Sequence, residues 1–119
     1  MTRIPSEERD IIEQEIYLPM VITILERDRK VIDKSHLKLK KPYLELVDCT
    51  IKEVYKDIKK TRDFLRKNKI KVFKQQSDES FTMYTFIYKG YEEHHNYFNP
   101  RLRNKCEELL TYYLKSPSN

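Results

Sequence analysis

The most regular hydrophobic pattern in the chain lies between Pro42 and Asn68. Large apolar residues recur there at intervals of three and four, which places them on one face of an α-helix for about three heptads. Pro42 suits the first turn of such a helix, and Thr61 takes one position of the series. The pattern predicts one long helix whose apolar seam packs inside a small domain or pairs as a coiled coil. The seam consists of Leu44, Val47, Ile51, Val54, Ile58 and Leu65.

The N-terminal segment up to Ile32 predicts a helix that begins at Ser6. The Ser6 hydroxyl is a suitable N-cap, and the acidic residues that follow it suit a helix N-terminus. Pro19 interrupts the pattern, so we expect a kink or a break close to it. Residues 16–25 are almost all apolar, which is compatible with a buried strand or with a helix. The polar residues 26–30 that follow favour the helix.

Two strands are predicted after the long helix. Residues 70–74 alternate between polar and apolar side chains, and residues 81–88 are aromatic and β-branched, as strands prefer. The polar residues 75–80 between them favour a turn, so the two segments predict a β-hairpin. The polar residues 91–95, which follow Gly90, are expected to form a loop.

A last helix is predicted from Asn99 to Lys115. Asn99 provides an N-cap, and the proline after it suits the first helical position. We expect a single small α+β domain over residues 1–115 and a frayed tail over residues 116–119. The apolar face of the last helix consists of Leu102, Cys106, Leu109 and Tyr113.

The predicted order of elements is helix, helix, hairpin, helix. A long basic helix that leads directly into a hairpin, with a closing helix behind it, resembles the layout of a winged-helix domain. The resemblance concerns the layout alone, since no family motif is matched. The predicted fold class is α+β, with two long N-terminal helices, a β-hairpin and a C-terminal helix.

Composition excludes several classes of protein. The 119 residues are 39% hydrophobic and 36% charged, which is enough apolar material for one packed core. Gly90 is the only glycine, so the glycine-rich loops that hold phosphates in many nucleotide-binding enzymes are absent. No apolar stretch is long enough to cross a bilayer, and we expect no membrane partner. Cys49 and Cys106 are expected to be reduced, mostly buried thiols of a cytoplasmic protein.

Basic residues are concentrated in the middle of the chain. Residues 52–74 carry ten basic and three acidic side chains, whereas residues 1–28 carry a net charge of −4. This density of positive charge suits the binding of phosphates, and Phe73, Tyr84 and Tyr88 are near enough to stack on bases. The alternative is a solvated face on which opposite charges pair. The acidic first residues would compete with nucleic acid if they folded back over the basic surface. The candidate nucleic-acid-binding residues are Lys56, Lys60, Lys67, Lys69 and Lys71.

The predicted hairpin is apolar on both faces. Either the domain covers both faces, or one of them is kept for a partner. Tyr84, Phe86 and Tyr88 alternate onto one face and form the candidate partner interface. The opposite face carries Phe81, Met83 and Ile87.

Signals for catalysis and metal binding are weak. Residues 92–95 are two glutamates and two histidines, but adjacent histidines of an extended segment point to opposite faces. No second cluster of Cys or His lies at zinc-site spacing, so we expect no metal. The chain also lacks a nucleophile elbow and an isolated carboxylate pair in an apolar setting. We therefore expect neither an enzyme nor a bound cofactor.

These features predict a small binding module. Our first hypothesis is a nucleic-acid-associated regulatory protein whose basic helix and hairpin contact nucleic acid or an acidic protein surface. The alternative is a protein–protein adaptor, or a homodimer, that assembles through the apolar seam and the aromatic hairpin. Phosphate contacts make affinity fall steeply with salt, whereas an apolar interface hardly responds, so the two hypotheses differ in an observable way.

Overall fold

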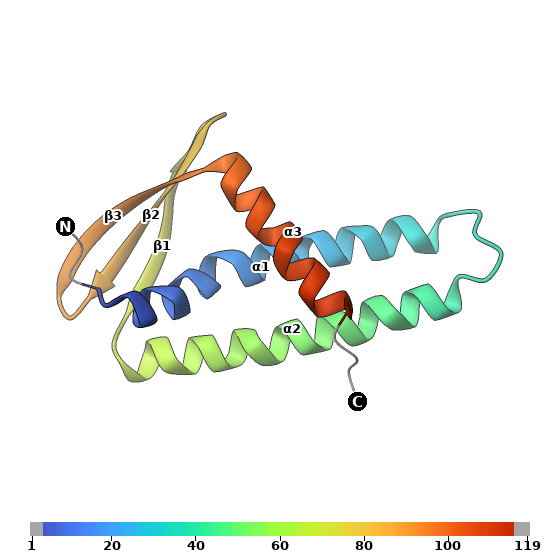
Figure 1. Ribbon diagram of the computed structural model, residues 1–119, viewed down its shortest axis with the longest axis horizontal. Coiled ribbons are helices and arrows are strands. Elements are labelled where there is room, and N and C mark those ends of the chain that lie inside the picture. The colour runs from blue at the N-terminus through green and yellow to red at the C-terminus, as the bar shows by residue number, and fades with distance from the viewer. Residues whose placement is uncertain (1–3, 116–119) are drawn as a thin grey trace.

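Residues 4–115, which the computed structural model describes, form three helices and one antiparallel sheet of three strands (Figure 1). The predicted α+β class is therefore confirmed. The predicted tail over residues 116–119 lies outside the described residues. In chain order the elements are α1 (Ser6–Asp33), α2 (Lys41–Lys67), β1 (Lys71–Ser77), β2 (Phe81–Tyr88), β3 (Tyr91–Phe98) and α3 (Asn99–Lys115).

The helix α1 is continuous and contains Pro19 in its interior. Residues 16–25 are therefore helical, and no break occurs at the proline. Proline removes one helical hydrogen bond, but burial of neighbours such as Val21 holds the two halves of the helix together. The expected N-cap was wrong, because Pro5 takes that position and no side chain caps the helix. Ser6 is instead the first helical residue.

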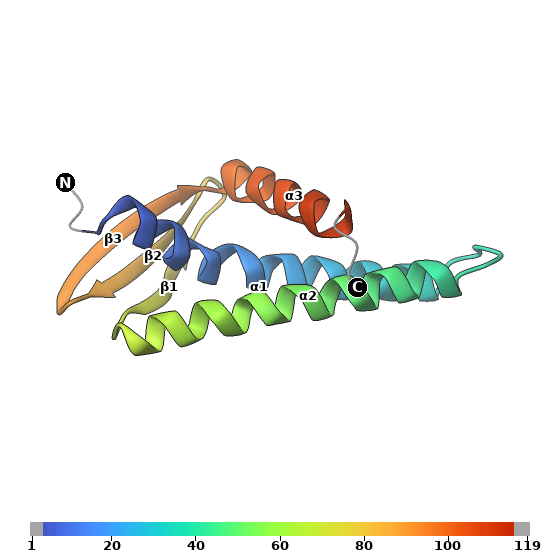
Figure 2. The same ribbon diagram turned by 60° about the horizontal axis from the view of Figure 1, so that its bottom comes forward.

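The helix α2 returns alongside α1 and packs its apolar seam against it (Figures 1 and 2). Val54 and Ile58 of the seam are buried, and Thr61 is buried among them. The seam was predicted either to pack inside the domain or to pair as a coiled coil, and in the structure it packs inside the domain. The helix runs for 27 residues without a turn to divide it. The winged-helix resemblance is thus limited to the order of elements.

The sheet has the order β1-β2-β3, and both neighbouring pairs are antiparallel. The third strand was not predicted, since residues 91–95 were expected to form a loop. All eight residues of β3 pair with the eight residues of β2. The connection is a tight turn in which Lys89 and Gly90 have φ values of 50° and 82°. Positive φ at both positions is the geometry of two-residue β-hairpins.

One face of the sheet, which we call the inner face, packs on the helices. Tyr84, Phe86 and Tyr88 of β2 lie on this face and are 6%, 0% and 3% exposed. They form one core cluster with Ile12 and Ile16 of α1. The residues that we expected to form a partner interface are therefore core residues, and a partner cannot reach them in the folded domain.

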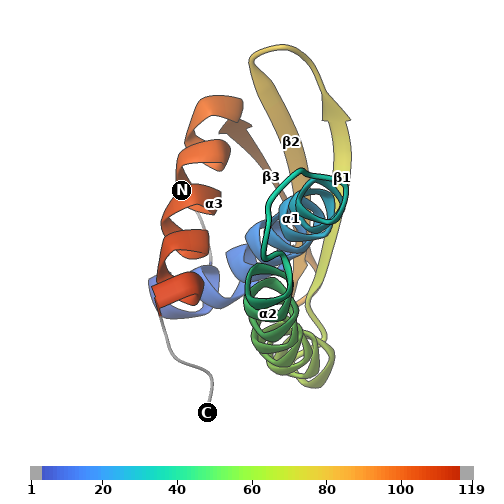
Figure 3. The same cartoon turned by 90° about the vertical axis from the view of Figure 1, so that its right-hand side faces the viewer.

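The helix α3 is attached to the sheet through Asn99. Its side-chain oxygen accepts a hydrogen bond from the Thr82 hydroxyl at 2.7 Å, and its amide donates to the Asp78 carbonyl at 2.9 Å. These bonds hold the β1–β2 turn against the start of the helix. From there α3 crosses over the two long helices (Figures 1 and 3). The Tyr113 hydroxyl donates a hydrogen bond to Asp57 of α2. The buried face of α3 is the predicted one.

Candidate nucleic-acid interface

The second face of the sheet, which we call the outer face, carries accessible phenylalanines. Side chains alternate along a strand, so Phe73, Phe81 and Phe98 point away from the inner face. Their exposed fractions are 45%, 44% and 44%, and the ring centroids of Phe81 and Phe98 lie 5.4 Å apart. Accessible rings on an open sheet can stack on unpaired bases.

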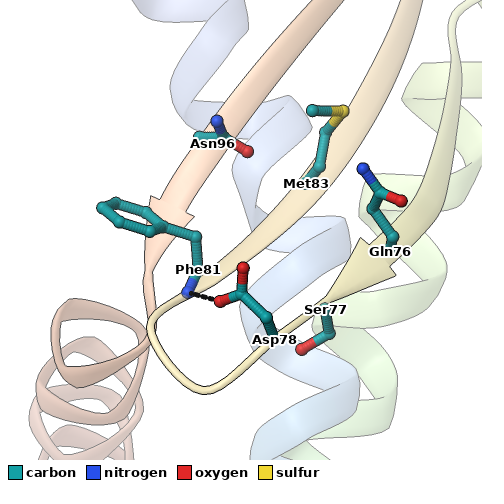
Figure 4. A pocket seen from close by; sticks show the side chains of 6 residues that line it. All are labelled: Gln76, Ser77, Asp78, Phe81, Met83 and Asn96. Carbon is teal, nitrogen blue, oxygen red and sulfur yellow. Dashed lines mark hydrogen bonds between the residues drawn. The ribbon is translucent and has the colours of Figure 1, made fainter.

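A hollow of about 330 Å³ opens on the outer face beside Phe81 (Figure 4). Met83 lines it together with the side-chain amides of Gln76 and Asn96, groups that can pair with base edges. Asp78 also lines it, but its carboxylate is occupied by hydrogen bonds from two backbone N–H groups of the turn, at 2.7 and 2.8 Å. These bonds lower the pKa of the Asp78 carboxyl, and the bond from the Phe81 N–H has the largest effect.

A second hollow, of about 800 Å³, lies where the end of α2 turns into β1. We call it the basic hollow, because four cationic side chains line it against a single acidic one, Glu15 of α1. Phe73 lines it as well and so joins the basic hollow to the outer face of the sheet. The cationic residues are Arg62, Arg66, Lys69 and Lys71.

The arginines of the basic hollow are paired, and its lysines are not. Arg62 lies 3.2 Å from the Glu15 carboxylate, and Arg66 lies 2.6 Å from the Asp63 carboxylate. The acidic α1 therefore contributes one group to this surface. Within residues 4–115, Lys69 and Lys71 form no ion pair, so both charges are available to a ligand.

Lys69 has a strained backbone conformation. Its φ of 57° lies in the left-handed region that glycine adopts most easily. The Lys69 N–H donates to the Arg66 carbonyl at 3.2 Å, and the Ile70 N–H donates to the Leu65 carbonyl at 2.8 Å. This Schellman motif ends α2 and sends the chain directly into β1. Lys69 therefore holds a backbone conformation that glycine would adopt with less strain.

Two of the five predicted lysines, Lys69 and Lys71, therefore lie together in the basic hollow. Lys60 instead lines a separate groove between the helices. It is two residues from Arg62, which is about 200° around the helix, so the two side chains point in opposite directions.

The other two predicted lysines lie outside the basic hollow. Lys56 is exposed and lies 3.1 Å from the carboxylate of Glu53. Lys67 is exposed in the last turn of α2 and does not line the hollow. Lys56, Lys60 and Lys67 thus share one side of α2, and the prediction missed Arg62 and Arg66, whose spacing of four residues places them together on another side of the helix.

The two adjacent histidines point to opposite faces of β3, as strand alternation predicts. His94 lies on the outer face, with its Nδ1 2.9 Å from the Thr85 hydroxyl. The His95 ring stacks on Phe86 with 4.5 Å between ring centroids, and its Nε2 lies 3.0 Å from the Glu93 carboxylate. Among residues 4–115, no group of three side chains is placed to hold a metal ion.

The two thiols differ in exposure. Both are free, and Cys106 is buried as expected. Cys49 is exposed on α2, so the expectation that both thiols are mostly buried was wrong for this residue.

The geometry defines a small α+β domain with an open aromatic sheet face and an adjoining basic hollow. The chain belongs to the YhjD protein family, whose model matches residues 3–118. It is 49% identical over 117 residues to the uncharacterized protein YhjD of Bacillus subtilis (strain 168), an alignment that covers 98% of each chain. No solved structure matches the chain. The family match spans every element described above, from α1 to α3.

Proposed function

We propose that this protein is a non-enzymatic module that binds single-stranded nucleic acid across the outer face of the sheet and the basic hollow. The observation that carries the proposal is the position of Lys71 and Phe73, two residues apart on the same face of β1. There an unpaired cation and an accessible ring contact a phosphate and a base of one strand. Lys69, at the turn into β1, supplies a second unpaired cation.

A single strand suits this surface better than a duplex. Inside a duplex, neighbouring base pairs cover the ring faces of each base, whereas the bases of a single strand can unstack and expose them. Phe73, Phe81 and Phe98 present three rings on an open sheet for such bases to stack on. Reading a duplex in its major groove requires a helix or a β-ribbon that enters the groove. The amides of Gln76 and Asn96 add donors and acceptors for the edge of a stacked base.

Fluorescence anisotropy with short labelled DNA and RNA strands tests the proposal. Affinity should fall with salt with a log–log slope of about −0.7 for each phosphate contacted, or about −2 for three phosphates. Changing Lys69→Gln together with Lys71→Gln should reduce the magnitude of that slope by about 1.4. Phe73→Ala should weaken binding by roughly 5- to 150-fold, the range for the loss of one stacked base.

The matched control is Lys56→Gln together with Lys60→Gln, which changes the net charge by the same amount on another side of α2. This control should leave the affinity nearly unchanged. An equal loss in the control would mean that net charge alone attracts the oligonucleotide. Tighter binding of a duplex, or no binding of any strand at low salt by the folded protein, would also overturn the proposal.

A further inference from the structure

The connection between α1 and α2 lies at the far end of the molecule from the sheet (Figure 1). We call residues 29–46, which include this connection and the adjoining helix ends, the hairpin tip. In the described part of the chain, no helix is long and apolar enough to cross a membrane. The hairpin tip nevertheless combines the two kinds of side chain that bind a membrane surface.

Large apolar side chains of the hairpin tip are exposed to water. Leu39 is 72% exposed, Tyr43 53% and Leu37 44%. On the adjoining helix ends, Val31 is 62% exposed and Leu46 is 49% exposed. Single exposed apolar residues are ordinary, but this concentration at a protruding end is typical of an interaction surface.

The same segment is strongly basic. Residues 29–41 contain six basic residues and one acidic residue. Arg29 is occupied by Asp48, with contacts of 2.6 and 3.2 Å that join the two helices. The Lys40 ammonium donates to the Asp33 carbonyl at 2.7 Å. Within residues 4–115, the cations of the tip that form no ion pair or side-chain hydrogen bond are Lys30, Lys34, Lys38 and Lys41.

Hydrogen bonds hold the connection in shape. The Ser35 hydroxyl donates to the Ile32 carbonyl at 2.6 Å and accepts from the Leu37 N–H at 3.3 Å. The backbone next to Leu37 is therefore fixed to the end of α1. The side chains of Leu37 and Leu39, which follow this fixed segment, are exposed to water.

We propose that the hairpin tip docks on the surface of a membrane that contains anionic lipids. Leu37 and Leu39 enter the boundary between headgroups and acyl chains, and Tyr43 lies at headgroup level, where tyrosine is enriched. The lysines keep their charged ends among the lipid phosphates. The proposal goes beyond the nucleic-acid function and uses other residues. It revises the expectation of no membrane partner, which rested on the lack of a spanning segment.

Other occupants would contact favourably only one of the two kinds of side chain in the hairpin tip. A nucleic acid would neutralise the lysines but would leave Leu37 and Leu39 in water. A second copy would cover the leucines but would place two strongly basic segments against each other. An anionic lipid surface is complementary to the charge and removes the apolar side chains from water in the same contact.

Co-sedimentation with lipid vesicles tests the proposal. The protein should bind vesicles that contain phosphatidylglycerol, bind phosphatidylcholine vesicles much more weakly, and lose affinity as salt is raised. Lys38→Gln with Lys41→Gln should weaken binding roughly 30-fold, about fivefold for each lysine. Leu37→Ser with Leu39→Ser should weaken it about tenfold or more. The control pair Lys56→Gln with Lys60→Gln should bind as the wild type does.

A fluorescent probe locates the contact. The chain contains no tryptophan, so Leu39→Trp introduces a unique emission that should shift to the blue with anionic vesicles. The emission of Tyr55→Trp, at a 48% exposed position in the middle of α2, should not shift.

Equal shifts at both positions, equal loss of vesicle binding in the control pair, or no vesicle binding by the folded protein would overturn the proposal. Loss of oligonucleotide binding in Leu37→Ser with Leu39→Ser, with no loss on vesicles, would assign the tip to nucleic acid instead. Vesicles and oligonucleotides are separate measurements, so either proposal can fail alone.

Discussion

The Tyr97 hydroxyl donates a hydrogen bond of 2.6 Å to the Glu13 carboxylate and so joins the last strand to the first helix. A similar bond of 2.8 Å runs from the Tyr88 hydroxyl to Glu8. Two carboxylates of the acidic α1 therefore hold tyrosines of the sheet, and only Glu15 lines the basic hollow. These two acidic residues thus attach the sheet to α1, and among residues 4–115 no carboxylate forms an ion pair with Lys69 or Lys71.

Removal of the Tyr97 hydroxyl should destabilise the protein. Tyr97→Phe loses a hydrogen bond to a charged acceptor, which is worth about 1.5–3 kcal/mol. Urea denaturation should therefore show a lower midpoint. Tyr55→Phe is the control, since Tyr55 is exposed on α2 and should change stability by less than about 0.5 kcal/mol. Equal midpoints for the two variants would contradict the role of the Tyr97 bond.

Alkaline pH should destabilise the fold. Burial raises the pKa of Tyr17 from 10.0 to about 12. Burial and hydrogen bonds to carboxylates raise the pKa values of Tyr97 and Tyr113 as well. The folded state keeps these protons to higher pH than the unfolded state, so the stabilisation is complete below about pH 10 and is lost as pH rises through the raised values. Denaturant titrations on both sides of about pH 10 should show this decline, with a smaller slope for Tyr97→Phe. A flat profile would refute the prediction.

The two cysteines should react at very different rates. Cys49 is exposed and should react with a thiol reagent in the folded protein. Cys106 is buried, and burial raises the pKa of its thiol, so it should react only when the protein unfolds. Counting modified thiols by mass spectrometry before and after addition of denaturant should give one and then two. Modification of both thiols at the same rate in the folded protein would be inconsistent with the packing of α3.

Truncation of the seam should be costly where the seam is fully buried. Ile58→Ala should lower the free energy of unfolding by about 2–5 kcal/mol, the range for a buried aliphatic residue. Ile51→Ala should cost less, because this side chain is only partly buried. Leu46→Ala, at an exposed position of the same helix, should stay within about 0.5 kcal/mol of the wild type. The order of the three denaturation midpoints tests this assignment of faces.

Substitutions of Lys69 should affect the stability of the protein and its nucleic-acid binding independently. Lys69→Gly should relieve the left-handed backbone strain and stabilise the protein by about 1 kcal/mol, while it weakens nucleic-acid binding. Lys69→Ala removes the same charge but keeps the strain, so its stability should match the wild type and its affinity should match Lys69→Gly. Thermal unfolding and anisotropy on the same samples give both readouts. Unchanged affinity in both variants would remove Lys69 from the candidate site.

The helices could be predicted because their spacing is a local property. Apolar residues at intervals of three and four defined the seam of α2, and Asn99 marked the start of α3. The strand β3 escaped prediction because its inward side chains include Glu93 and His95, which form a polar pair beside Phe86. Its only local signal was the two-residue turn at Lys89 and Gly90.

By itself, the sequence determined the α+β class, the long amphipathic helix, and a basic segment that includes Lys69 and Lys71. Only the tertiary structure decided which face of β2 is buried, since Tyr84 and Met83 are both apolar and the helices cover one face alone. It also decided which cations lie together. The chain turns at Lys69, and this turn places the first residues of β1 next to one side of the end of α2. Lys71 therefore lies in the same hollow as Arg62, whereas Lys60 lies outside it. Sequence distance cannot reveal such a grouping, because it depends on how the elements pack and on which side of a helix each residue lies.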